Sequence, residues 1–286
     1  MINNIFVNEI NKHNPQNITE TKSAMKETLQ KIILEGLGKS DFFNNVVFYG
    51  GTSLRIFRDL PRFSEDLDFT LLDKNVGCDF DGCLLFAKRE LESFGIDCDI
   101  YNKDKNIDTT VDTRYFRFNL KSLFDISFPE YSNQIISTEL LTVKIELERN
   151  SFSGGKVEVK LLTYPSFVQI KTYSMETLFA SKLIAVLNRK WKTRIKGRDY
   201  YDYLFYIMQE TKPNMVFLEN GLKQFGFIDR DESYSLNKLK KDLKEKFSNV
   251  DFDNAINDVK PFVSNDDKII QSFNKEIFIA SIELIK

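Results

Sequence analysis

One stretch of the chain, Val46–Leu72, constrains the fold more than any other. It opens with the apolar run Val46–Tyr49, which predicts a short buried strand, and a pair of glycines and a potential helix follow at once. Asp66-Leu67-Asp68 then begins a second apolar run, which predicts a second strand. Residues two apart in a strand share a face, so Asp66 and Asp68 are expected to point the same way and Leu67 into the core.

This combination of two aspartates and two glycines suits a nucleotide and its metal. Carboxylates side by side repel each other unless a cation lies between them, and Mg²⁺ is bound through one or two carboxylates together with substrate phosphates. Gly50 and Gly51 have no Cβ, so backbone N–H groups can approach a phosphate there. The alternative is that the glycines form an ordinary turn and that Asp66 and Asp68 are solvated loop charges.

The segments Gly50–Arg55, GGTSLR, and Arg62–Phe69, RFSEDLDF, together resemble the AbiEii/AbiGii family of the nucleotidyltransferase superfamily. Members of this family are toxins of bacterial toxin–antitoxin and abortive-infection systems. The resemblance implies a metal-dependent transferase that uses an NTP, in which Asp66 and Asp68 are catalytic and hold Mg²⁺. It also implies a nucleotide-binding set made of Gly50, Gly51, Thr52, Arg55, Ser64 and Lys182.

A third carboxylate is expected on a strand beside the one that carries the two aspartates. The segment Val143–Leu147 resembles the second motif of the family, and Glu146 within it is the candidate third metal ligand. The alternative is that Glu146 is one of the polar residues on the open face of a half-buried strand. Lys144 and Glu148 alternate in the same way, which keeps this alternative open.

Two later segments resemble the third and fourth motifs of the family. Lys182 lies in the first of them and by resemblance contacts the nucleotide phosphates, although Ser181 stands where the family usually has an acidic residue. Asp199 lies in the second, and would act as a general base or hold Lys182 in position. The alternative is that Asp199 caps its helix and that Asp202 pairs with Arg198.

Two expectations follow from these assignments. Asp66 and Lys182 are expected on exposed faces, so alanine at either position should change stability little. The loop between the last two motifs is basic and contains an aromatic residue, which suits an RNA backbone or a polyphosphate, although a solvated loop is the alternative. Its candidate RNA-binding residues are Lys190, Trp191, Lys192, Arg194 and Lys196.

Composition excludes several other mechanisms. The only histidine, His13, lies in a polar segment, which argues against a Ser-His-Asp or Cys-His mechanism and against a histidine-rich zinc site. Cys78, Cys83 and Cys98 lack zinc-like spacing and are odd in number, so a reducing cytoplasm is expected. Neither a signal peptide nor a membrane span is predicted. The net charge of −2 means that any surface for nucleic acid must be a local patch.

The predicted fold class is α+β. We expect an N-terminal nucleotidyltransferase-like mixed β-sheet flanked by helices over residues 1–168, followed by a mainly helical part over residues 169–286 that carries Lys182 and Asp199. The polar residues 1–17 are expected to form a loose arm. Residues 214–286 are predicted helical but carry no motif that indicates a function.

The family resemblance also suggests an acceptor and a partner. Related toxins add nucleotides to tRNA 3′ ends and thereby block aminoacylation, and a separately encoded antitoxin, expected from an upstream gene, restrains them. A first alternative is a nucleotidyltransferase that acts on a protein or on a small molecule such as an antibiotic. A second alternative is an inactive nucleotide-binding regulator, which the replacement at Ser181 keeps open.

Overall fold

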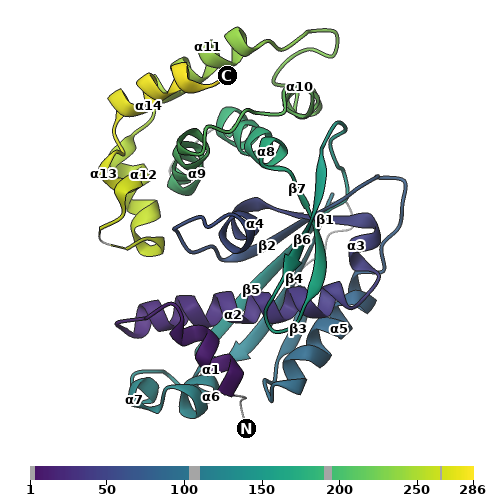
Figure 1. The fold of residues 1–286 in the computed structure, drawn as a ribbon, viewed down its shortest axis with the longest axis vertical. Coiled ribbons are helices and arrows are strands. Elements are labelled where there is room, and N and C mark those ends of the chain that lie inside the picture. Colours follow the sequence, from purple (N-terminus) through teal and green to yellow (C-terminus); the bar gives the residue numbers. More distant parts are fainter. Residues whose placement is uncertain (1–3, 103–109, 190–194, 265) are drawn as a thin grey trace. The chain divides into compact units, whose positions relative to one another are not determined.

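A seven-stranded mixed sheet organises the first part of the chain, as the computed structural model of residues 4–102, 110–189, 195–264 and 266–286 shows (Figure 1). The strand order is β3-β4-β5-β2-β1-β7-β6. The strands are β1 Val46–Tyr49, β2 Asp66–Leu71, β3 Asp99–Asn102, β4 Val111–Asn119, β5 Leu140–Glu148, β6 Val157–Leu162 and β7 Val168–Tyr173. Helices flank this sheet and dominate the chain after β7, so the predicted α+β class is confirmed.

The helices before β7 are α1 Asn4–Asn11, α2 Ile18–Gly38, α3 Phe42–Asn45, α4 Gly50–Phe57, α5 Phe80–Ser93, α6 Leu120–Ser127 and α7 Pro129–Ser132. Those after β7 are α8 Met175–Asn188, α9 Gly197–Met208, α10 Met215–Gln224, α11 Leu236–Ser248, α12 Phe252–Val259, α13 Lys268–Gln271 and α14 Lys275–Ser281, with short 3₁₀ turns at Lys260–Phe262 and Ile282–Leu284. No helix among the described residues is long and apolar enough to cross a membrane.

Alternating apolar side chains build the centre of the sheet. In β5, Val143, Ile145 and Leu147 are buried while the residues between them are partly exposed, as the two-residue period predicts. β1 and β2 are antiparallel, and Phe48 lies opposite Phe69 with ring centroids 5.1 Å apart. These buried rings fix the register that decides where the aspartates of β2 point.

Contacts divide the chain into two compact units, and neither is continuous in sequence. The first comprises Met1–Thr52, Ser64–Ser151 and Val159–Thr172. The second comprises Ser53–Phe63, Phe152–Glu158 and Tyr173–Lys286. Two short segments from the sequence before residue 168 therefore belong to the unit that contains the C-terminal helices.

Two local expectations were wrong. Residues 4–11 form helix α1 rather than a loose arm, because Phe6 and Ile10 are fully buried and anchor it. The strand β7 was not predicted, and it extends the sheet through residues that were assigned to the boundary between the two parts. In β7, the buried Val168 and Ile170 alternate with more exposed polar residues.

Candidate active site

The turn between β1 and α4 brings a glycine against an aspartate of the neighbouring strand. Gly50 adopts φ +77°, and Tyr49 before it pairs with Asp68 across the two antiparallel strands. A Cβ atom built on Gly50 would lie 2.2 Å from Oδ2 of Asp68. The position therefore requires glycine for both its backbone conformation and its space, and the Asp68 carboxylate lies against the first residue of α4.

The three predicted carboxylates lie on neighbouring strands. β2 and β5 are parallel, with Asp66 opposite Lys144 and Asp68 opposite Glu146. Asp66 and Asp68 are partly exposed while Leu67 between them is buried, so the two aspartates share the open face of β2 as predicted. Because register partners in a sheet point to the same side, Glu146 joins them on that face.

Basic side chains lie close to the carboxylates on this acidic face. Nζ of Lys144 lies 2.5 Å from a Glu146 carboxylate oxygen. Burial raises the pKa of Asp66 above its usual value, and the nearby Glu65 and Glu146 add to this, while Lys144 and Lys26 oppose it. Asp66 therefore lies where an additional cation would be favourable.

The donors on this face fit Mg²⁺. Carboxylate oxygens are the hard ligands that this ion prefers, and it commonly takes only one or two of them from the protein. Across the described parts of the chain, no group of three or more His, Cys, Asp or Glu side chains is arranged to hold a metal. Asp66 and Asp68 are the pair predicted to hold the ion, and Glu146, predicted as a third ligand, is paired with Lys144; metal binding by these residues stays a prediction.

Other residues predicted to bind the nucleotide make contacts that shape the same region. Thr52 is fully buried, and its hydroxyl donates to the Asp66 carbonyl oxygen at 2.5 Å, which ties α4 to the start of β2. The Arg55 guanidinium donates to two backbone carbonyl oxygens of the segment that follows α4. The Ser64 carbonyl oxygen accepts a bond from the Gln30 side chain. Nucleotide binding by these residues stays a prediction.

A second cluster of charges is formed within the unit that contains the C-terminal helices. Nζ of Lys182 on α8 lies 2.9 Å from Oδ1 of Asp199 and 2.8 Å from Oδ2 of Asp202, both on α9. Arg62 donates to both oxygens of Asp202, from Nε at 2.6 Å and from Nη2 at 2.7 Å. Arg189 donates to the second oxygen of Asp199. We call these five residues the buried ionic cluster, of which the Arg189 side chain is 37% exposed.

Each charge in the buried ionic cluster is stabilised by its neighbours. Burial would raise the pKa of Asp202, but Arg62 and Lys182 outweigh it and hold that pKa at about 2. Burial likewise acts against the Asp199 carboxylate, yet Lys182 and Arg189 keep its pKa below the usual value. Burial disfavours the Lys182 ammonium, and Asp199 and Asp202 nevertheless raise its pKa. All three side chains are therefore charged at neutral pH.

The cluster corrects one expectation, for Lys182, and contradicts both parts of the alternative given for Asp199 and Asp202. Lys182 does not project into solvent, because its side chain is only 14% exposed and its two carboxylate partners are buried. Asp202 pairs with Arg62 and Lys182, whereas Arg198 lies 3.8 Å from Asp258 instead. Asp199 lies in the first turn of α9 and does not cap it, since the helix begins at Gly197.

Sequence reasoning missed Arg62 and Arg189 as members of this cluster. Arg62 belongs to the segment that carries the family resemblance, and its place in that motif was the one signal in the sequence that could have indicated a role for it. Of the predicted RNA-binding residues, Lys190, Trp191, Lys192 and Arg194 lie outside the described residues. Lys196 is described, immediately precedes α9, and contributes to the lowered pKa of Asp199.

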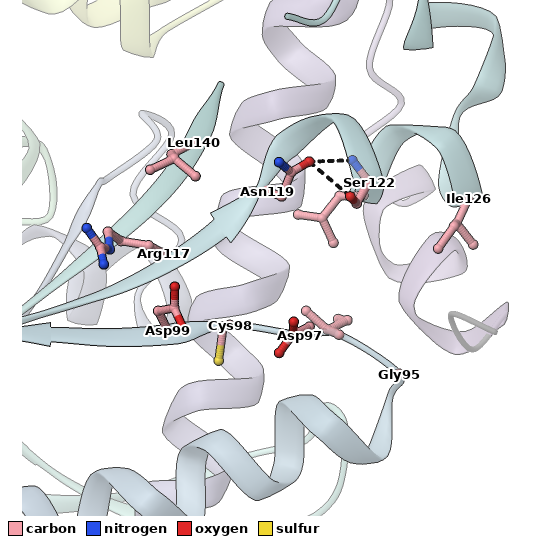
Figure 2. A pocket seen from close by; sticks show the side chains of 11 residues that line it. Gly95, Asp97, Cys98, Asp99, Arg117, Asn119, Ser122, Ile126 and Leu140 are labelled. Carbon is pink, nitrogen blue, oxygen red and sulfur yellow. Dashed lines mark hydrogen bonds between the residues drawn. The ribbon is translucent and has the colours of Figure 1, made fainter. Parts of the chain in front are cut away.

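A cavity of about 550 Å³ lies at the far end of the sheet from the acidic face. Figure 2 shows Arg117, Asp99 and Asn119 among its lining residues, and none of the predicted site residues lines it. Along β5, Leu140 at the cavity is six residues from Glu146, which corresponds to about 20 Å of strand. The cavity is therefore separate from the acidic face.

A glycine turn between a strand and a helix, beside a strand with two aspartates on one face, is the arrangement of a nucleotidyltransferase. Residues 32–274 match the model of a family described as the nucleotidyl transferase AbiEii toxin of type IV toxin–antitoxin systems. The chain belongs to this family, and the resemblance seen in its motifs is confirmed.

Two solved structures share the fold at low sequence identity. JHP933 from Helicobacter pylori is 19% identical with a TM-score of 0.54, over 92% of this chain and 90% of that one. MenT4, a nucleotidyltransferase toxin from Mycobacterium tuberculosis, is 15% identical with a TM-score of 0.59, over 97% and 88% of the two chains. No curated protein sequence matches the chain.

Proposed function

We propose that this toxin transfers a nucleoside monophosphate from an NTP to a hydroxyl of RNA, at the 3′ end of tRNA, and releases pyrophosphate. Such a transfer would block aminoacylation and arrest growth, as a toxin of phage defence requires, until an antitoxin restrains it. The observation that carries the proposal is the acidic face, where Asp66 and Asp68 lie beside the glycine turn of α4. Membership of the AbiEii family supports the toxin role.

The residues of the acidic face have distinct tasks in this transfer. In the reaction, the acceptor hydroxyl loses its proton to solvent and its oxygen bonds to the α-phosphorus, while the bond from that phosphorus to the oxygen bridging to the β-phosphorus breaks and pyrophosphate leaves. Gly50 and Gly51 let the backbone at the start of α4 approach the phosphates. Asp66 and Asp68 would hold Mg²⁺, and the ion would supply positive charge to neutralise the phosphates.

The buried ionic cluster has its own proposed task. Its two aspartates keep Lys182 charged and fix its position, which suits a residue that contacts a phosphate. Asp199 is a poor proton acceptor, since Lys182 and Arg189 lower its pKa. Of the two roles predicted for Asp199, we therefore favour holding Lys182 over acting as a general base.

Labelled NTPs test the reaction. The protein is incubated with each of the four labelled NTPs, Mg²⁺ and total RNA, and label in RNA and released pyrophosphate are both measured. Asp66→Asn and Asp68→Asn should each lower the rate on the order of a thousandfold, because a metal ligand contributes several kcal/mol to the transition state. Asp97→Asn, at an exposed position of the same unit, is the matched control and should transfer at the wild-type rate.

Four results would redirect the assignment. If the protein is folded and RNA stays unlabelled with all four NTPs, the acceptor is not RNA. Label in crude lysate that survives nuclease but not protease would indicate a protein acceptor, and label that survives both would indicate a small molecule. NTP binding without pyrophosphate release would indicate the inactive regulator that the replacement at Ser181 suggests.

A further inference from the structure

The strand β6 ends the sheet on one side, next to β7, and the opposite end is β3. An end strand presents backbone N–H and C=O groups to whatever lies beside it, and such a strand readily pairs with another chain. Proteins that avoid this pairing place charged residues on the exposed face of the end strand, or keep that strand very short or bulged. The side chains of β6 therefore decide whether this edge is protected or open to a partner.

The exposed face of β6 is apolar. Val157, Val159 and Leu161 are 38%, 56% and 52% exposed, and they alternate with Glu158 and Lys160, which are partly exposed. Glu158 accepts a bond at 2.7 Å from Arg58, whose side chain is only 10% exposed. The two most exposed residues of the strand, Val159 and Leu161, are therefore apolar, whereas the Glu158 side chain is 40% exposed and is paired within the chain.

The sequence of β6 is complementary to itself in one register. If two copies pair antiparallel with a two-fold axis at Val159, Glu158 of each copy lies opposite Lys160 of the other, and Val157 lies opposite Leu161. A shift by two residues places Glu158 opposite Glu158, or Lys160 opposite Lys160, and like charges directly opposite are destabilising. A shift by one residue puts the apolar stripes of the two copies on opposite faces.

We propose that β6 is a homodimerisation strand, through which two copies of this chain join their sheets in the register centred on Val159. Opposite charges on one face and apolar side chains on the other both select a second copy as the occupant. By symmetry the pair of Glu158 with Lys160 occurs twice in each dimer. The end strand β3 offers no such match, since its four residues contain one acidic and no basic side chain.

Molar mass measured by light scattering over a range of protein concentrations tests the proposal. The wild-type chain should approach the mass of a dimer as concentration rises. Val159→Lys should remain monomeric, because it puts two ammonium groups opposite each other at the two-fold axis. Ile136→Lys is the matched control at an apolar residue that is 69% exposed elsewhere, and it should dimerise as the wild type does. Thermal melting confirms that each variant is folded.

A charge exchange tests the register itself. Lys160→Glu alone should weaken the dimer about tenfold, since two unlike pairs become two like pairs. Glu158→Lys alone should weaken it as well, and the double variant Glu158→Lys with Lys160→Glu should restore it. A wild type that is monomeric at every concentration, a Val159→Lys variant that still dimerises, or a double variant that stays as weak as Lys160→Glu would each overturn the proposal.

Discussion

Replacing Lys182 with alanine should destabilise the fold as well as affect activity. The substitution removes an ammonium group that lies 2.9 Å from Asp199 and 2.8 Å from Asp202, whose side chains are 2% and 0% exposed. Breaking a buried ion pair by removing one partner costs about 3–5 kcal/mol, because the remaining charge is left without compensation. Arg62 and Arg189 each still neutralise one of the two carboxylates, so the expected loss is near 3 kcal/mol.

Urea denaturation of the wild type and the variant measures this loss. Lys88→Ala is the control, since Lys88 forms only a loose surface pair at 3.9 Å with Glu92, and such pairs contribute about 0–1 kcal/mol. If Lys182→Ala unfolds at the wild-type urea midpoint with the same slope, the two aspartates are not buried around Lys182 in solution, and the account of the buried ionic cluster fails.

Two further predictions concern other parts of the molecule. Gly50→Ala should destabilise the fold by about 1–3 kcal/mol and weaken NTP binding, because the new Cβ would meet Asp68 at a left-handed backbone position. Thermal melting measures the first effect and a fluorescent NTP analogue the second. A variant with unchanged stability and NTP binding would contradict the close approach of Gly50 to Asp68. The folded-state pKa of Asp202 is lowered to about 2. The contribution of Asp202 to the free energy of unfolding is therefore fully present above its unfolded-state pKa of about 4, and is lost as the pH falls toward 2. The unfolding free energy of Asp202→Asn should therefore vary less than that of the wild type over this range, by on the order of 2 kcal/mol, and parallel pH profiles from urea denaturation would contradict this.

Local patterns were enough to predict the acidic face but not the buried ionic cluster. The alternation in β2 and β5 set the directions of Asp66, Asp68 and Glu146, because the side-chain period of a strand is fixed. Arg62 and Asp202 are 140 positions apart in the sequence, so the periodicity of side chains along one helix or strand cannot predict their contact. A lysine on a helix is usually solvated, so Lys182 was misplaced until its partners were known.

The two local errors have the same cause. Helix α1 has a sequence rich in asparagine, which favours loops and caps, and it is held by the burial of Phe6 and Ile10 against other parts of its unit. The strand β7 is short, and its period-two pattern is confined to Val168–Tyr173 at a point where a break between parts of the chain was expected. In both places tertiary packing decides a structure that local propensity leaves open.

The interleaving of the two units has a consequence for how the chain is synthesised and inherited. Arg62 leaves the ribosome 140 residues before Asp202, which at about 5–20 residues per second is an interval of about 7–28 s. Throughout that time the carboxylate that Arg62 contacts in the folded chain has not been synthesised, and its unit cannot be completed. For the same reason, recombination at one point in the gene that exchanges the C-terminal helices preserves this pair only if the donor sequence has a carboxylate that matches an arginine encoded far upstream.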